Sequence, residues 1–228
     1  MADYVLLHGA FQGGWIWHEV AKRLRAQGHR VFCPSLDGCA ERAVNLRPEI
    51  TAESWGKEIA GLIFFEDLTQ VILVGTSMGA VAAAHAAQEA PERIGRFVLI
   101  DGLLPGPGET IAQAVNRKPY DPSELTYGSK RAYDDLEPAS LRDWAKARYT
   151  PQPRIPSDGP MDLHKFWSLK WRANVVRCTQ HSGPPEAHQR KNAERLGVRL
   201  SEIDAGHYAP LSHPDIVARL LHGLSTGD

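Results

Sequence analysis

The sequence predicts an α/β fold with a mostly parallel sheet, helices on both faces and an inserted cap. Short, continuous apolar runs alternate with segments whose apolar residues recur at helical spacing, which is typical of consecutive strand-helix-strand units. The 228 residues fit one domain, because single cores commonly extend to about 200 to 250 residues. With 43% hydrophobic and 23% charged residues, the composition excludes a disordered or fibrous chain.

Strands are expected where apolar runs are short and bounded by turn residues. In chain order these runs cover residues 4–7, 30–33, 71–74, 96–100, 174–178 and 198–203. Helices are expected over residues 15–27, 52–65, 80–90, 186–196 and 214–224. Gly28 is a typical C-terminal stop for the first helix, and Thr51 is a candidate N-cap for the second.

Residues 104–172 differ from the rest of the chain, because they are rich in proline and tryptophan and show no clear sheet pattern. We interpret them as a cap inserted into a core formed by residues 1–103 and 173–228, at the strand edge where open α/β sheets bind ligands. Their rings either line a pocket for an aromatic or alicyclic group or join an irregular lid to the body. These aromatic residues are Tyr120, Tyr127, Tyr133, Trp144, Tyr149, Phe166, Trp167 and Trp171.

The candidate nucleophile is Ser77, in the string Gly75-Thr76-Ser77-Met78-Gly79. A G-x-S-x-G string alone is a weak signal, but this one lies between an apolar strand and a small-residue helix, as a nucleophile elbow requires. Glycines suit the sharp turn and the close passage of the helix beside neighbouring strands. The alternative is a serine in an ordinary turn between a strand and a helix.

A serine hydroxyl needs a base within hydrogen-bond reach, and His207 is the best candidate among the ten histidines. It follows the last predicted strand and precedes the final helix, so it belongs at the carboxyl edge of the sheet. Serine first and histidine last is a known chain order for this chemistry. His213 is the nearest alternative, and we interpret His8 as a structural hydrogen-bonding residue.

Taken together, these motifs resemble the α/β-hydrolase superfamily. The segment from His8 to Trp15, the elbow at Ser77 and the run Asp204-Ala205-Gly206-His207 carry the resemblance. Within the superfamily, the chain is similar to small esterases that include plant methylesterases, hydroxynitrile lyases and bacterial pyrethroid-type esterases. The resemblance implies an oxyanion hole formed by the backbone N–H groups of Ala10 and Met78, and such fixed donors stabilise developing negative charge.

The third member of the triad departs from this pattern, because His181 occupies the position where the similar plant enzymes carry the acid. Asp101, at the end of the strand that follows the elbow helix, is our preferred replacement. Glu186 is an alternative, Asp204 is expected to point away, and a dyad or a damaged site also stays open. The acid matters because its loss can cost about ten-thousandfold in rate.

The sequence therefore favours a serine hydrolase that cleaves a carboxylic ester of a small aromatic or alicyclic molecule through an acyl-enzyme. A lactone or thioester hydrolase would use the same residues. A hydroxynitrile lyase is disfavoured, because the similar lyases carry threonine in place of Gly9 and lysine in place of Tyr208. A non-catalytic small-molecule receptor is the third hypothesis, prompted by His181.

The net charge and the cysteine content limit which partners and cofactors can be expected. The formal net charge of −1, from 26 basic and 27 acidic residues, argues against nucleic acid binding. Three cysteines are too few for a disulfide framework, and no metal-ligand spacing is present, so we expect no metal or organic cofactor. No segment is typical of a signal peptide or membrane span, which predicts a soluble cytoplasmic protein. Whether the cap forms a homodimer interface stays open.

Overall fold

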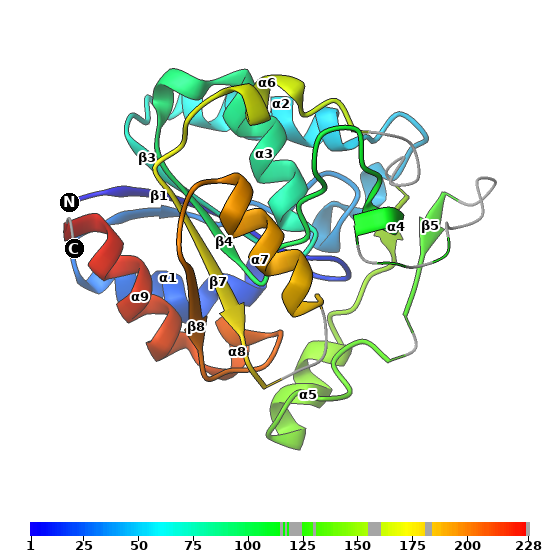
Figure 1. Ribbon diagram of the computed structural model, residues 1–228. Helices are drawn as coiled ribbons and strands as arrows, with labels where there is room; N and C mark the ends of the chain where they lie inside the picture. The colour runs from blue at the N-terminus through cyan, green and yellow to red at the C-terminus, as the bar shows by residue number, and fades with distance from the viewer. Residues whose placement is uncertain are drawn as a thin grey trace.

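A computed structural model describes residues 1–114, 116, 118, 125–129, 131–154, 161–180 and 184–226. Its centre is a six-stranded sheet with the order β2-β1-β3-β4-β7-β8, in which every neighbouring pair is parallel (Figure 1). The strands are β1 (Asp3–Leu7), β2 (Arg30–Phe32), β3 (Val71–Thr76), β4 (Ile94–Ile100), β7 (Ala173–Cys178) and β8 (Leu200–Ile203). This sheet confirms the predicted fold class.

Helices cover both faces of the sheet, as predicted. One face packs against α1 (His18–Ala26) and α9 (Pro214–Thr226), and the other against α2 (Ala52–Phe65), α3 (Gly79–Glu89) and α7 (Glu186–Arg195). Alternate side chains of the central strands enter the two apolar clusters, with Leu73 on one face and Val74 on the other. Because these strands are buried on both faces, they read in the sequence as continuous apolar runs.

The ends of the helices follow the predicted signals. Thr51 caps α2 through a reciprocal pair of bonds, in which the Ser54 N–H donates to Thr51 Oγ1 at 3.0 Å and the Thr51 N–H donates to Ser54 Oγ at 2.9 Å. Gly28 follows α1 at a φ of 83°, a left-handed conformation that glycine adopts without strain. The predicted first helix differs at its start, because residues Gly14–Trp17 form a separate 3-10 helix.

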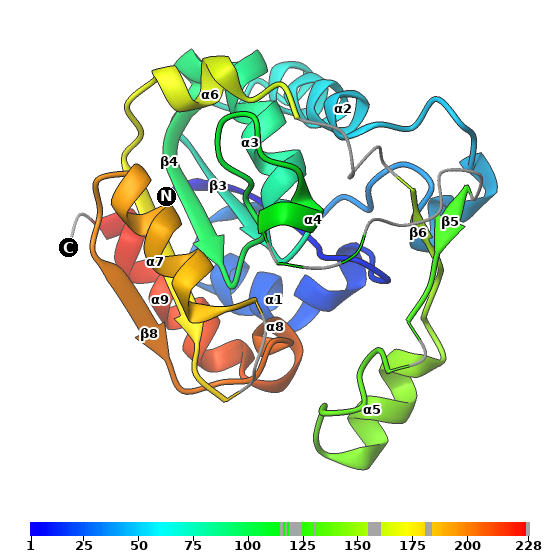
Figure 2. The ribbon, with the colours of Figure 1, turned by 45° about the vertical axis from the view of Figure 1, so that its right-hand side comes forward.

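The segment between β4 and β7 divides into two parts. Its last helix, α6 (His164–Ser168), packs on α3 and belongs to the main core through Phe166. The earlier part carries α4 (Ile111–Ala114), β5 (Thr126–Tyr127), α5 (Ala139–Lys146) and β6 (Gln152–Pro153). Figure 2 shows β5, β6 and α5 as an arm that extends away from the sheet. We call the described residues of this arm, 125–129 and 131–154, the cap arm.

Several short elements were not predicted. Strands β5 and β6 pair antiparallel over two residues each, which is too short for an alternating pattern to be visible in a sequence. The expected loop through residue 48 contains a 3-10 helix over Ala40–Asn45, and a four-residue helix, α8 (Ala209–Ser212), follows His207. In the described part of the chain, no helix is both long and apolar enough to cross a bilayer.

The three cysteines are free and shielded. Cys39 and Cys178 are buried and Cys33 is half-buried. Burial raises the pKa of the Cys33 and Cys39 thiols to about 12, and it raises the pKa of Cys178 as well. All three side chains therefore stay protonated and act as small apolar groups near neutral pH.

Candidate active site

Ser77 lies on a tight turn between β3 and α3 and has a φ of 48°, the left-handed region that a serine rarely adopts. Its carbonyl accepts hydrogen bonds from the N–H groups of Ala80 at 3.1 Å and Leu103 at 2.9 Å. A Cβ at Gly79 would lie 2.5 Å from the His8 carbonyl oxygen, and one at Gly75 would lie 2.7 Å from the Gly79 carbonyl oxygen. Both glycines are therefore required by close backbone approach, as predicted.

The structure brings Ser77, His207 and Asp101 together from the ends of three strands. His207 Nε2 lies 3.1 Å from Ser77 Oγ, and His207 Nδ1 lies 2.6 Å from Asp101 Oδ2. The Asp101 side chain is fully buried, and its Oδ1 accepts the Cys178 N–H at 3.2 Å. Because Asp101 accepts at Nδ1, the imidazole is oriented with Nε2 toward the serine, where it can take a proton.

The other candidate acids lie elsewhere. The Glu186 carboxylate pairs with Arg190 at 2.6 Å and Arg177 at 3.2 Å. Its hydrogen bond from Arg190, with the charge of Arg177, lowers the Glu186 pKa. Asp204 Oδ1 accepts from Gln180 Nε2 at 2.9 Å, so it points away from His207 as expected. His181 lies outside the described residues.

The other two histidines that we singled out have structural contacts. His8 is fully buried, with Nδ1 donating to the Gly9 carbonyl at 2.8 Å and Nε2 accepting the Leu36 N–H at 2.9 Å. Burial lowers the His8 pKa to about 4, so the ring is neutral near neutral pH. His213 precedes α9 and contacts the Ser212 hydroxyl at 2.8 Å.

Residues 8–14, which we call the oxyanion loop, run past the nucleophile. A Cβ on Gly9 would lie 2.8 Å from Ser77 Cβ, so glycine is needed there for the loop to approach the serine. The Gly9 N–H donates to Gln12 Oε1 at 2.9 Å, a contact that the sequence did not reveal. Gly13 and Gly14 pack against the chain after β2, where a Cβ on Gly14 would lie 1.9 Å from the Cys33 carbonyl oxygen.

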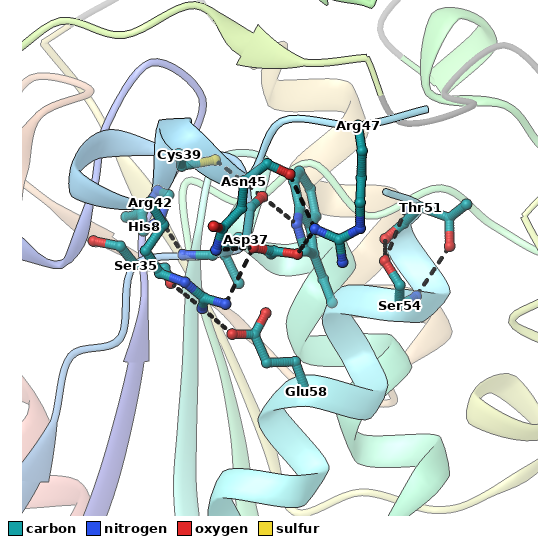
Figure 3. A network of polar contacts seen from close by, with 12 residues as sticks. His8, Ser35, Asp37, Cys39, Arg42, Asn45, Arg47, Thr51, Ser54 and Glu58 are labelled. Atoms are coloured by element: carbon teal, nitrogen blue, oxygen red, sulfur yellow. Dashed lines mark hydrogen bonds and ion pairs between the residues drawn. The ribbon is translucent and has the colours of Figure 1, made fainter. Parts of the chain in front are cut away.

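The loop that follows β2 packs against the oxyanion loop and holds it by hydrogen bonds. Ser35 Oγ accepts the Gly14 N–H at 2.8 Å, beside the bond between Leu36 and His8. Figure 3 shows the polar network of this supporting loop, with Asp37 accepting from Asn45 at 3.0 Å. Arg42 bridges Asp37 and Glu58 of α2, which fixes the loop to the body.

The two N–H groups of the predicted oxyanion hole are available. In the described part of the chain, neither the Ala10 N–H nor the Met78 N–H donates to a protein acceptor. Met78 is buried and Ala10 is half-buried. A buried N–H without a partner is costly, and a substrate oxygen is the kind of acceptor that would satisfy it.

The aromatic residues of the cap separate into two groups. Phe166 and Trp171 stack with ring centroids 5.2 Å apart and pack around Phe97 in the main core, so these rings join the lid to the body. A second group surrounds the oxyanion loop and the base. It contains Tyr127, Tyr133, Trp144 and Tyr149 of the cap arm, with Phe11, Trp15 and Tyr208 of the body. Tyr120 lies outside the described residues.

Comparison with known proteins agrees with this geometry. A family model described as the alpha/beta hydrolase family matches residues 4–220. The chain is 27% identical to the carbendazim hydrolyzing esterase of Nocardioides sp. (strain SG-4G), over 98% of this chain and 100% of the relative. It is 28% identical to methylesterase 3 of Arabidopsis thaliana, over 95% and 93%. These relatives confirm the resemblance seen in the residues.

A solved structure extends the comparison to the fold. An extracellular alpha/beta-hydrolase from a Paenibacillus species superimposes with a TM-score of 0.84 at 23% sequence identity. The superposition covers 98% of each chain, so the two proteins share their architecture from end to end.

Proposed function

The chain belongs to the alpha/beta hydrolase family, and from that premise we propose that it is a serine hydrolase that cleaves carboxylic esters of small molecules. The observation that carries the proposal is the hydrogen-bonded series from Ser77 through His207 to the buried Asp101. The two named relatives with full-length matches are esterases, which supports an ester as the bond that is cleaved.

The reaction follows from the positions of these groups. Ser77 Oγ attacks the ester carbonyl carbon while His207 Nε2 takes the serine proton. The N–H groups of Ala10 and Met78 donate to the carbonyl oxygen as it becomes negative, and Asp101 stabilises the positively charged imidazole. His207 then protonates the leaving alcohol. Water, activated by the same imidazole, attacks the acyl-enzyme, releases the acid and restores the serine.

An aromatic or alicyclic group in the substrate is supported by the rings beside the base. The Tyr208 ring lies 5.5 Å from the His207 ring and 4.8 Å from the Tyr133 ring. Tyr133 is itself fully buried and lies 6.2 Å from Trp15, so the ring beside the base that stays partly open is that of the half-buried Tyr208. Aromatic side chains of this kind bind flat apolar groups well.

The two other sequence hypotheses gain no support. A threonine at position 9 would place its Cβ 2.8 Å from Ser77 Cβ, and the Tyr208 hydroxyl accepts the Tyr133 N–H at 3.1 Å, which a lysine ammonium could not do. Both features disfavour a lyase like those that the chain resembles. The receptor hypothesis rested on the missing acid, and the 2.6 Å contact between Asp101 Oδ2 and His207 Nδ1 argues against it.

The test is hydrolysis of p-nitrophenyl acetate, butyrate and benzoate by the wild type and by Ser77→Ala, with labelling by a fluorophosphonate as a second readout. We expect the wild type to turn over these esters and to be labelled at Ser77. Ser77→Ala should lose at least about a thousandfold in kcat and all labelling. Equal rates from the two proteins, or labelling at another residue, would overturn the proposal.

A further inference from the structure

We propose that Gln152 and Tyr133 of the cap arm are positioning residues for the oxyanion hole, because they fix both backbone polar groups of Phe11, the neighbour of Ala10. The Phe11 N–H donates to Gln152 Oε1 at 3.2 Å, and the Tyr133 hydroxyl donates to the Phe11 carbonyl at 2.9 Å. The inference rests on the proposed function, since it concerns the donor that binds the substrate oxygen.

The conformation of Phe11 explains why such contacts are needed. Phe11 has a φ of 66°, and left-handed backbone at a bulky residue persists only when surrounding contacts impose it. Its ring lies between Tyr149, stacked at 5.4 Å, and Tyr127, edge-on at 5.4 Å. The cap arm therefore holds this residue through its N–H, its carbonyl and its ring.

Gln152 and Tyr133 are themselves well fixed. Gln152 is 1% exposed and Tyr133 is 0% exposed. Burial raises the pKa of the Tyr133 phenol, so the hydroxyl keeps the proton that it donates. The segment just before the strand of Gln152 is joined to the chain after β2, because the Ala40 N–H donates to Thr150 Oγ1 at 3.0 Å.

Tyr133 also joins the oxyanion loop to the base. Its N–H donates to the Tyr208 hydroxyl at 3.1 Å, and Tyr208 directly follows His207. Tyr133 shares the left-handed conformation, with a φ of 66°, as do Ser77 and Asp101 at 48° and 52°. Strained backbone of this kind is often found at functional sites, and four of the eight such non-glycine residues in the described part of the chain, Phe11, Ser77, Asp101 and Tyr133, lie at or beside this one.

The position of Ala10 depends on these contacts. The peptide that carries the Ala10 N–H is held on one side, where its Gly9 carbonyl accepts from His8 Nδ1 at 2.8 Å and the preceding Gly9 N–H donates to Gln12 Oε1. On the other side, Gln152 holds the peptide between Ala10 and Phe11 through the Phe11 N–H, and Tyr133 holds the next peptide through the Phe11 carbonyl. Loss of either contact should let the Ala10 N–H turn away from the substrate oxygen without changing the apolar surface around it.

The experiment compares two inhibitors in Gln152→Met, Tyr133→Phe and the wild type. With a trifluoromethyl ketone, Ser77 Oγ adds to the carbonyl carbon and the serine proton passes to His207. The resulting adduct carries an oxyanion that lies in the oxyanion hole. The matching methyl ketone stays a ketone and reports ground-state binding. Because loss of a whole oxyanion donor costs about a hundredfold or more, a misplaced one should cost about tenfold in Gln152→Met and less in Tyr133→Phe.

Gln88→Met is the matched control. Gln88 Oε1 accepts the Phe166 N–H at 3.2 Å, the same kind of contact at the same length, but between α3 and α6. We expect both methionine variants to lose thermal stability. Only Gln152→Met should also lose kcat and trifluoromethyl ketone affinity by a common factor, with KM and methyl ketone affinity within about twofold of the wild type.

The outcomes separate this inference from the proposed function. An unchanged ratio of the two inhibitor affinities in Gln152→Met and Tyr133→Phe, or an equal change in Gln88→Met, would overturn the inference and leave the hydrolase intact. If Gln152→Met does not fold, Tyr133→Phe, which removes one oxygen, decides by the same ratio. A wild type that neither hydrolyses esters nor forms the ketone adduct would overturn the proposed function and the inference with it.

Discussion

Ser77, Asp101 and His207 follow strands of the main sheet and are placed by it, whereas the oxyanion loop opposite them is held in part by side chains of the cap arm. The strand ends are held by backbone bonds, such as the Asp101 N–H to the Val176 carbonyl at 2.7 Å. The cap arm contributes a few side-chain bonds and ring contacts. The comparison teaches that the proton-transfer groups are held by the central sheet, while the stabilisation of charge also depends on a peripheral segment.

The largest expected effect comes from changing the triad acid, which is placed by the main sheet. Asp101→Asn should lower kcat by about a thousandfold or more, because asparagine keeps an oxygen for the Cys178 N–H but cannot accept and stabilise the proton on His207 Nδ1. Glu186→Gln, whose carboxylate pairs with Arg177 and Arg190, should stay within about twofold of the wild type. Both variants are measured by steady-state hydrolysis of p-nitrophenyl esters, and their folding is checked by circular dichroism. A loss below tenfold in Asp101→Asn would contradict the assigned triad.

The second effect compares the two parts of the inserted segment. Phe166→Ala should lower the free energy of unfolding by about 3 to 5 kcal/mol, because a fully buried ring in the main core leaves a cavity. Trp144→Ala, on the half-exposed face of α5 with the Arg148 guanidinium 3.9 Å from its ring, should cost about 1 kcal/mol or less. Urea unfolding of both variants is the measurement. Equal losses would contradict the weaker packing that the structure gives Trp144.

The smallest effect concerns the pH dependence of stability and comes from His8, the first residue of the oxyanion loop. The pKa of His8 is about 4 in the folded protein, below the value of about 6.5 that a histidine has in the unfolded chain. As the pH falls, the His8 ring is therefore protonated in the unfolded chain before it is protonated in the folded one. Stability should therefore be intact above pH 6.5 and decline toward pH 4, with His8 contributing on the order of 3 kcal/mol of that loss. Urea unfolding across this range, compared with His8→Gln, isolates the contribution.

His85→Gln is the control for that measurement. Burial also lowers the His85 pKa to about 4, but this residue lies on α3 away from the oxyanion loop. Both variants should flatten the dependence of stability on pH, while only His8→Gln should also slow ester hydrolysis. An unchanged pH dependence in His8→Gln would show that the ring is already protonated or never buried.

The sequence predicted the sheet side of the site well for a physical reason. Strands buried on both faces need continuous apolar runs, and polar residues just beyond them must lie at the carboxyl edge, so Ser77, Asp101 and His207 could be placed together. Asp101 was preferred over Glu186 on this ground, and the geometry agrees. The need for glycine at positions 75 and 79 could also be predicted, because it arises within the single turn that carries Ser77.

The cap side could not be predicted, because its contacts join residues that are far apart in the chain and carry no local pattern. Gln152 and Tyr133 meet Phe11 across 141 and 122 residues, and a lone glutamine or tyrosine in an irregular segment has no signature. The packing of Gly13 and Gly14 against the chain after β2 could not be predicted either, because this contact also joins segments that are separated in the sequence. The boundaries of the cap at residues 104 and 172 stay a prediction.

The buried cysteines give the protein a practical property. Because burial keeps the thiols of Cys33, Cys39 and Cys178 protonated near neutral pH, maleimides and similar reagents should react with them slowly. A single cysteine introduced on exposed α5, as in Ser140→Cys, would then be the fast-reacting thiol of the chain. A fluorophore or spin label could be attached there without first removing the native thiols, so motion of the cap arm could be followed in the otherwise natural sequence.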